Sequence, residues 1–175
     1  QSATLRWDQA LGDGLLKTVL GYSHVDQETG ANAPLVRADY QNNPTLNYHA
    51  IANRKVDALR LSAAWERESG DTLVSITPYL RDNSMELLAS FTLSFDPTVY
   101  TSQNRSFGVL AKWRRDFPSM RARLIAGLDL DISPGGREED KLSVTSTGAG
   151  ASRVYTGYTV GSRIYDYDVT YLGVS

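Results

Sequence analysis

His24 and His49 are the only histidines in this chain of 175 residues, and the chain has no cysteine. Imidazole nitrogens and thiolates are the ligands that zinc prefers, and the usual zinc sites space them regularly along the chain. The two histidines show no such spacing and no accompanying pattern of carboxylates. We therefore predict no metal site, and solvated loop histidines are the better interpretation.

Charged side chains that alternate with apolar ones raise a second possible chemistry, acid–base catalysis. Mixtures of arginine and carboxylate on a protein wall more often pair with one another than act on a substrate. Neither a Ser-His-Asp arrangement nor a pair of catalytic carboxylates can be identified among them. We therefore predict that the chain is not an enzyme and binds no cofactor of its own. The charged set consists of Arg60, Glu66, Lys112, Arg114, Arg123, Asp129 and Asp131.

The segment SPGGREED, residues 133–140, superficially resembles a phosphate-binding loop. It lacks the strand–loop–helix context and the Lys-Ser/Thr pair with which such loops hold a phosphate, so we predict a loop tip. The charge also argues against nucleic acid as a partner, because the net charge is −2 and no basic stripe is present.

Arginine and tyrosine are frequent in the segments between the apolar stretches. These residue types suit anionic ligands that carry aromatic groups, through charge-assisted hydrogen bonds and stacking. Loops commonly carry recognition residues, although a solvated loop residue is the alternative interpretation for each of them. The candidate ligand-binding residues are Arg37, Tyr40, Tyr48, His49, Tyr100, Arg105, Arg153, Tyr155 and Tyr158.

Strands must position these candidates, because helical periodicity is scarce along the chain. Segments with period-two alternation, bounded by turn residues, predict about six strands and the beginning of a seventh. The length fits one domain over residues 1–175, and we predict an all-β, antiparallel fold. The predicted strands are Ala3–Gln9, Leu15–Val25, Lys55–Arg67, Thr72–Asn83, Arg105–Asp116, Arg121–Ile132 and Tyr165–Ser175.

The predicted connections between these strands alternate in length. Three are tight turns rich in Gly, Asp, Pro and Ser, at Ala10–Gly14, Glu68–Asp71 and Asp116–Ser119. Long connections are uncommon in compact soluble domains, whereas outer-membrane β-barrels combine short periplasmic turns with long extracellular loops. The predicted long loops are Asp26–Arg54, Ser84–Asn104 and Ser133–Ile164.

Each predicted strand has one apolar and one polar face. In residues 120–132, Leu124 lies on the apolar face, and Arg123 and Asp129 lie on the other. Alternation alone would also fit a soluble sheet with its apolar face inside. Pro78 falls within a strand, and we expect a β-bulge there.

The three tryptophans of the chain, Trp7, Trp65 and Trp113, favour lipid over a protein core. All three lie on the apolar faces, three or four residues from a short turn. A membrane interface collects tryptophans in a belt at one height, whereas a core would scatter them. We therefore predict that the apolar face meets lipid and that the charged face lines a wet interior.

Three stretches resemble strands of TonB-dependent outer-membrane receptors. TLRWDQALGDGLLKTVLGYS is similar to a strand–turn–strand unit, LRLSAAWERESGDTLVSITPYLRDN to a polar turn followed by a T-P-Y-x-R strand, and DVTYLGVS to the approach to a further strand. The resemblance covers nearly all of the chain outside the long loops. It implies part of a 22-stranded barrel with a plug domain. Such receptors import ferric siderophores, cobalamin and similar scarce solutes with energy supplied through TonB.

The chain also departs from this family. We find no plug domain, no TonB-box peptide and no final strand ending in an aromatic residue, and Gln1 rather than Met begins the chain. We expect a processed or excised piece, roughly the central third of a barrel wall. The resemblance then implies an outer-membrane segment that contacts lipid and a siderophore-like molecule, with iron as chelated substrate. TonB would act through the plug that is missing here.

Two alternatives stay open. A small passive or adhesive outer-membrane barrel would have an even number of strands. A soluble lipocalin-like or β-sandwich binding domain would place the apolar face inside. A barrel segment also leaves unpaired edge strands near residues 3–9 and 165–175, and we expect them to pair with another copy or with the rest of a barrel.

Overall fold

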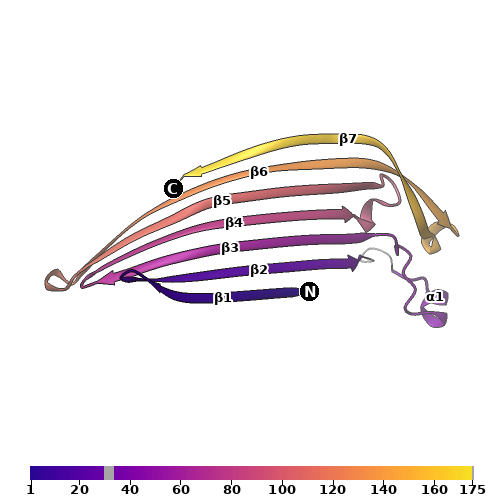
Figure 1. The fold of residues 1–175 in the computed structure, drawn as a ribbon. Coiled ribbons are helices and arrows are strands. Elements are labelled where there is room, and N and C mark those ends of the chain that lie inside the picture. The colour runs from indigo at the N-terminus through magenta and orange to yellow at the C-terminus, as the bar shows by residue number, and fades with distance from the viewer. Residues whose placement is uncertain (30–33, 175) are drawn as a thin grey trace.

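In a computed structural model, which describes residues 1–29 and 34–174, the chain forms one antiparallel sheet of seven strands in sequence order. Figure 1 shows the strands side by side in one curved layer, with β1 and β7 at opposite edges. The predicted all-β, antiparallel fold is therefore confirmed. The strands are β1 (Ser2–Leu11), β2 (Gly14–Glu28), β3 (Asn53–Ser69), β4 (Thr72–Leu88), β5 (Thr98–Phe117), β6 (Ala122–Thr147) and β7 (Val154–Val174).

Within the described residues, helix is confined to four short segments between strands. These are α1 (Arg37–Asn42) and the 3-10 turns Ser90–Thr92, Pro118–Met120 and Gly150–Ser152. Residue 175 of the predicted last strand and residues 30–33 of the first predicted loop lie outside the described residues.

The connections at one end of the sheet, called here the turn end, are short. Gly12 and Gly70 occupy the first two turns with φ of +63° and +56°, a left-handed conformation that glycine adopts without steric penalty. In the third turn, Arg121 takes this conformation, with φ of +47°. The connections at the opposite loop end are longer, as the sequence predicts.

Two of the predicted long loops are shorter than expected, because the strands continue into them. The segment predicted as Ser133–Ile164 is mostly strand, since β6 extends to Thr147 and β7 begins at Val154. SPGGREED is therefore part of β6 and not a loop tip. Its Gly135 pairs with Asn104 on one side and with Val169 on the other. Pairing with two neighbouring strands overrides the local turn signals of the Pro and Gly residues.

The expected bulge at Pro78 is also wrong. Ser62 pairs with Tyr79 and Trp65 with Ile76 in one unchanged register, so the β3–β4 pairing is interrupted between them without a shift. On the β5 side, Pro78 pairs with Val109. The missing N–H of proline is accommodated on the β3 side alone, and no extra residue is inserted.

The three hairpins are staggered by a constant step. The last pair of the first hairpin is Leu11–Gly14, and in the β2–β3 register Gly14 would lie opposite Arg67. The strand β3 continues two residues beyond that level and ends at Ser69. Thr72 pairs with Arg115, and β5 again ends two residues beyond, at Phe117. This stagger is one residue per strand. With a rise of about 3.3 Å per residue and a strand spacing of about 4.8 Å, it inclines the line of hairpin ends by about 35°.

The register gathers the apolar sides of the strands on one face. Trp65 lies level with Ile76, Ala111 and Leu128 across β3 to β6. We call this surface the apolar band, and its opposite side the polar face. The band consists of Leu5, Trp7, Leu16, Leu20, Leu59, Leu61, Ala63, Trp65, Val74, Ile76, Leu80, Phe107, Val109, Ala111, Trp113, Leu124, Ala126, Leu128, Leu130 and Ile132.

The seventh segment has apolar residues on both sides, and its faces are assigned by its register with β6. Leu172 and Val174 pair with Ile132 and Leu130 and so continue the apolar band. The alternate residues of β7, among them three tyrosines, lie on the polar face.

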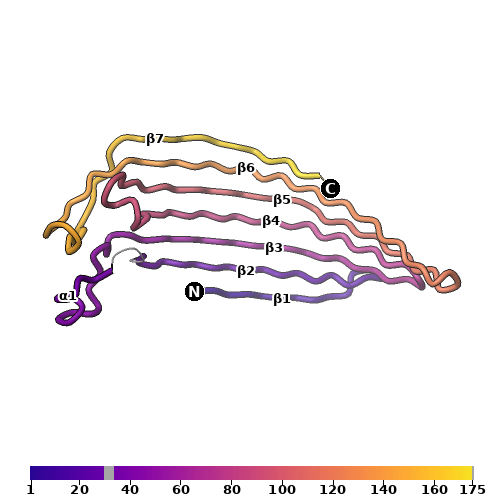
Figure 2. The backbone as a smooth tube through the Cα atoms, turned by 180° about the vertical axis from the view of Figure 1, so that it is seen from behind, coloured from indigo at the N-terminus to yellow at the C-terminus, as the bar shows by residue number. Residues whose placement is uncertain are grey.

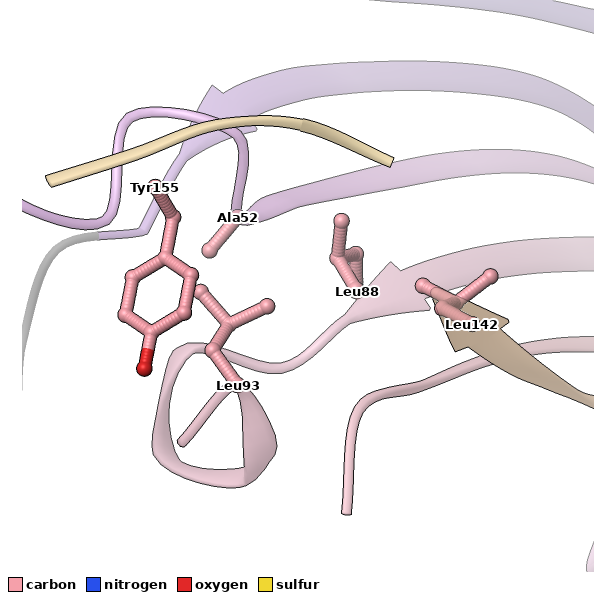
Figure 3. Packing of buried hydrophobic residues seen from close by; sticks show 5 residues of the cluster. All are labelled: Ala52, Leu88, Leu93, Leu142 and Tyr155. Carbon is pink, nitrogen blue, oxygen red and sulfur yellow. The ribbon is translucent and has the colours of Figure 1, made fainter. Parts of the chain in front are cut away.

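Buried apolar side chains gather at the loop end and not under the sheet. Figure 3 shows the five residues of this loop-end core, which come from β4, β6, β7 and the connections that precede β3 and β5. Figure 2 shows α1 and the β6–β7 tip at this same end of the sheet. The loop-end core consists of Ala52, Leu88, Leu93, Leu142 and Tyr155.

Candidate ligand-binding surface on the polar face

The polar face is hollowed near its middle. A depression of about 800 Å³ is lined mainly by side chains of this face, from β1 through β6. Because the lining residues converge from neighbouring strands, the sheet curves toward its polar side. Its polar lining includes Arg60, Ser62, Thr77, Tyr79, Arg81 and Asp129.

A hydrogen-bonded network crosses this surface from β4 to β6. The hydroxyl of Tyr79 donates to Asp131, and Arg81 Nη2 donates to the same carboxylate over 2.8 Å. Tyr79 passes over Gly108 of β5, where an added Cβ would lie 2.6 Å from the tyrosine oxygen. The absence of a side chain at Gly108 thus allows the Tyr79 side chain of β4 to cross β5 and reach β6.

Other charged residues of the polar face pair with one another near the turn end. Lys17 pairs with Glu66, and Arg114 Nη2 lies 2.7 Å from Glu68 Oε1. Asp116 accepts from Arg123. These ion pairs fix the charged side chains against the sheet. In the part of the chain that the structure describes, no three His, Asp or Glu side chains converge on a possible metal position.

The predicted loop candidates fall into different environments. Tyr40 in α1 is 63% exposed, and Arg37 begins the same helix. Arg153 and Tyr158 are exposed near the β6–β7 tip. These residues remain accessible at the loop end, so ligand binding by them stays a prediction.

Tyr48 and Tyr155 are buried, with 2% and 4% of their surface exposed. The Tyr48 hydroxyl donates to Asp39 Oδ2 over 2.6 Å and accepts from the N–H of Val36 over 3.1 Å. Its carbonyl accepts from the N–H of Tyr155 over 2.8 Å. Burial, together with the Asp39 carboxylate, raises the pKa of the Tyr48 phenol. These two tyrosines join the first long connection to β7 and present no free ring to a ligand.

His49 packs against the same junction. Its ring meets that of Tyr155 edge to face with centroids 5.2 Å apart, and its Nδ1 is buried without a hydrogen-bond partner among the described residues. Burial lowers the pKa of His49. The histidine therefore belongs to the packing of the loop end in its neutral form.

Tyr100 and Arg105 both lie in β5, although the sequence predicts Tyr100 in a loop and Arg105 only at the start of the strand. Arg105 pairs with Asp82 over 2.8 Å on the same face as the apolar band. Tyr100 lies on the polar face, with the guanidinium carbon of Arg137 4.3 Å from its ring centroid. Of the two, only Tyr100 belongs to the polar face.

Sequence reasoning missed three tyrosines on the polar face of β7. Tyr165, Tyr167 and Tyr171 pair with Glu139, Arg137 and Ser133 of β6. Their signal was the i, i+2, i+6 spacing within IYDYDVTYLGVS, which indicates one strand face once the register is known. Alternation alone does not choose this face, because both faces of the segment hold apolar residues.

The tryptophans occupy equivalent positions on the apolar band. Trp7, Trp65 and Trp113 each lie four residues before the last residue of their strand. Because the strand ends follow the constant stagger, the three rings lie at the same distance from the turn end of the sheet. Trp65 Nε1 also donates to the carbonyl of Leu11 over 3.1 Å, which fixes its ring beside the first turn.

No family model matches the chain, and no curated protein matches it. No helix among residues 1–29 and 34–174 is both long enough and apolar enough to cross a membrane.

Proposed function

We propose that the chain forms part of the wall of a TonB-dependent receptor in the bacterial outer membrane, which takes up a ferric siderophore or a similar scarce solute. The observation that carries the proposal is the apolar band. It runs across all seven strands, and no second layer of the described residues covers it. An apolar face of this extent needs an apolar partner, and lipid is the partner that a single curved layer fits.

The stagger of the hairpins supports closure of such a layer into a barrel. Closing a sheet requires strand tilt and a regular shift of register, with typical tilts of about 35–45°. The inclination of about 35° derived from the constant step lies at the lower limit of this range. A soluble sandwich would instead pack a second sheet on the apolar face.

The borders of the apolar band support the same orientation. On β3 the band runs from Leu59 to Trp65 and on β6 from Leu124 to Ile132, which is about 20–26 Å of strand. Toward the loop end this face becomes charged, with Asp57 and Asp82 next to the band. Toward the turn end, Arg67 pairs with Asp13 of the first turn over 2.5 Å. An outer-membrane barrel has an apolar zone of about 25 Å with polar borders.

In this proposal the polar face lines the lumen, and the loop end faces outward and receives the solute. The resemblance to TonB-dependent receptors supplies the remaining steps, in which a plug domain closes the lumen and TonB displaces it. The chain contributes wall and outer connections, while β1 and β7 pair with the rest of a barrel or with another copy. The chain itself catalyses no step in this proposal. The ion pairs of the polar face fix the positions of the side chains that line the lumen.

Uptake of radiolabelled iron by cells that express the natural protein tests this function. We expect accumulation of a ferric siderophore that requires both TonB and the proton motive force, and we expect the protein in the outer-membrane fraction. Uptake that persists without TonB would indicate a passive barrel. Recovery of the protein as a soluble monomer without detergent would contradict the membrane assignment itself.

A further inference from the structure

Arg60 of β3 lies on the polar face without a bonded partner. Its side chain forms no ion pair and no hydrogen bond with a residue in ranges 1–29 and 34–174. Elsewhere on this face, Arg54 bonds to the side-chain oxygen of Gln27 over 3.2 Å, and the other arginines of the strands each pair with a carboxylate. Arg60 therefore departs from the rule for this face. The carboxylate-paired arginines are Arg6, Arg81, Arg114, Arg123 and Arg137.

The register places Arg60 in an unfavourable position. It lies directly opposite Arg81 of β4, and like charges in such a cross-strand pair destabilise a sheet. Asp131 balances Arg81 over 2.8 Å. Asp129, the carboxylate that lines the depression, lies on β6, three strands away from Arg60. One positive charge is thus left on the β3 side of the depression.

An open slot lies beside the Arg60 side chain. Gly21 of β2 pairs with Arg60 on one side and with Thr4 of β1 on the other. A Cβ added at Gly21 would meet nothing within 4 Å. With a strand spacing of about 4.8 Å, the two flanking residues are about 10 Å apart across the glycine. All three residues line the depression, so the slot has a cation on one side and a hydroxyl on the other.

The aromatic side chains around the depression are already engaged. Tyr22 points to the opposite face of the sheet, where its hydroxyl donates to Asp57 over 2.7 Å. The Tyr79 hydroxyl donates to Asp131, and the guanidinium carbon of Arg81 lies 4.8 Å from the Tyr79 ring centroid. The free groups are a guanidinium and hydroxyls. A planar guanidinium matches the two oxygens of a carboxylate, and an aliphatic anion fits this lining better than an aromatic one.

We propose that Arg60 and the slot over Gly21 bind a carboxylate of the solute, which is an aliphatic polycarboxylate chelate of iron(III). The guanidinium would donate two parallel N–H bonds to this carboxylate, and the Thr4 hydroxyl would donate from the other side. This assignment rests on the proposed function, because it takes the polar face as the path of the solute, and it names the chemical class of that solute.

Binding to the full natural protein in detergent tests the assignment. The probe is iron(III) citrate, compared with an iron(III) tris-catecholate by titration calorimetry, and we expect the citrate complex to bind more tightly. Arg60→Gln should weaken its binding about tenfold or more, because a charge-assisted pair is lost. Arg60→Lys keeps the charge without the planar fork, and its affinity should lie between those of Arg60→Gln and the natural protein.

Lys112→Gln is the matched control. Lys112 is exposed on the same face and lies level with Glu66, which is six residues or about 20 Å from Arg60 along β3. The control removes the same charge outside the depression and should leave the affinity unchanged. Gly21→Val fills the slot without changing the charge, and it should weaken binding of iron(III) citrate as Arg60→Gln does.

Unchanged affinity in Arg60→Gln, an equal loss in Lys112→Gln, or tighter binding of the catecholate would overturn the assignment. Thermal unfolding adds a second measurement. Arg60→Gln should leave the unfolding temperature unchanged or raise it, because the repulsion from Arg81 is removed. A lower unfolding temperature with unchanged affinity would show that another part of the protein supplies the carboxylate, which also overturns the assignment. None of these failures alters outer-membrane location or TonB-dependent uptake, which test the proposed function separately.

Discussion

The loop-end core and the apolar band are built from the same residue types but differ in exposure. In the core, Leu88 is 0% and Leu93 1% exposed. In the band, Trp7 is 64% and Leu124 52% exposed. The chain therefore completes its packing by itself at one end only.

This difference separates two sources of stability. The loop-end core removes apolar surface from water through contacts within the chain, at about 25 cal/mol per Å² buried. The apolar band gains the same free energy of burial only when an external apolar phase, such as lipid, covers it. Changes in the core should therefore act in any solvent, whereas changes in the band should depend on the surrounding lipid.

The largest effect is expected from Leu93→Ala in the loop-end core. The cavity should reduce the free energy of opening this region by about 2–5 kcal/mol. Hydrogen exchange of the Tyr155 amide, which bonds to the Tyr48 carbonyl over 2.8 Å, reports that opening. Leu128→Ala in the band is the matched control and should leave this exchange rate unchanged. Equal acceleration by both variants would remove the distinction between the two regions.

A charge on either face of the sheet sharpens the comparison. Leu128 on the band and Leu110 on the polar face are 46% and 44% exposed in the isolated chain. Leu128→Arg should destabilise the protein in bilayers by about 2–4 kcal/mol, measured by denaturant titration. Leu110→Arg should have little effect, because Leu110 pairs with Asp129 across a wet face. The reverse order would place the polar face in lipid.

Gly108→Ala should disturb the crossing of Tyr79 over β5. The added Cβ would lie 2.2 Å from the Leu130 carbonyl oxygen, so backbone or ring must move. We expect a loss of about 1–3 kcal/mol, as for other overpacked sites, in unfolding experiments in detergent. Gly21→Ala on the same face meets nothing within 4 Å and serves as control. Similar stability of the two variants would show that the crossing is not tight.

Acidification should loosen the loop end slightly. The pKa of His49 is lowered by burial in the folded state, so the unfolded segment binds a proton more readily. This contribution is complete above the unfolded value of about 6.5 and declines as the pH falls below it. Proteolysis of the first long connection should be faster at about pH 5 than at about pH 7.5. His49→Gln should abolish this dependence, and His24→Gln should retain it.

The turn-end half of the fold could be predicted from the sequence. Alternation is regular there, and glycines such as Gly12 and Gly70 mark the turns. The extensions of β6 and β7 could not be predicted, because Pro134, Gly135 and Gly136 are local turn signals. Their strand conformation arises from pairing with β5 and β7.

The candidate site was less predictable than the fold. Tyr48 and Tyr155 look like loop residues in the sequence, and only contacts between distant segments reveal their burial. The face on which Tyr165, Tyr167 and Tyr171 of β7 lie could be assigned only from the register with β6. Residue type and spacing thus indicate strands, whereas accessibility depends on long-range packing.

Depth-dependent quenching of tryptophan fluorescence by brominated lipids tests most directly whether the apolar band meets lipid. Variants of the natural protein that keep one of Trp7, Trp65 and Trp113 at a time would be reconstituted in bilayers. We expect all three to be quenched with the same depth profile, strongest for bromines near the headgroups, because each ring lies four residues before its strand end. Quenching by aqueous iodide but not by brominated lipid would contradict the orientation on which the account rests.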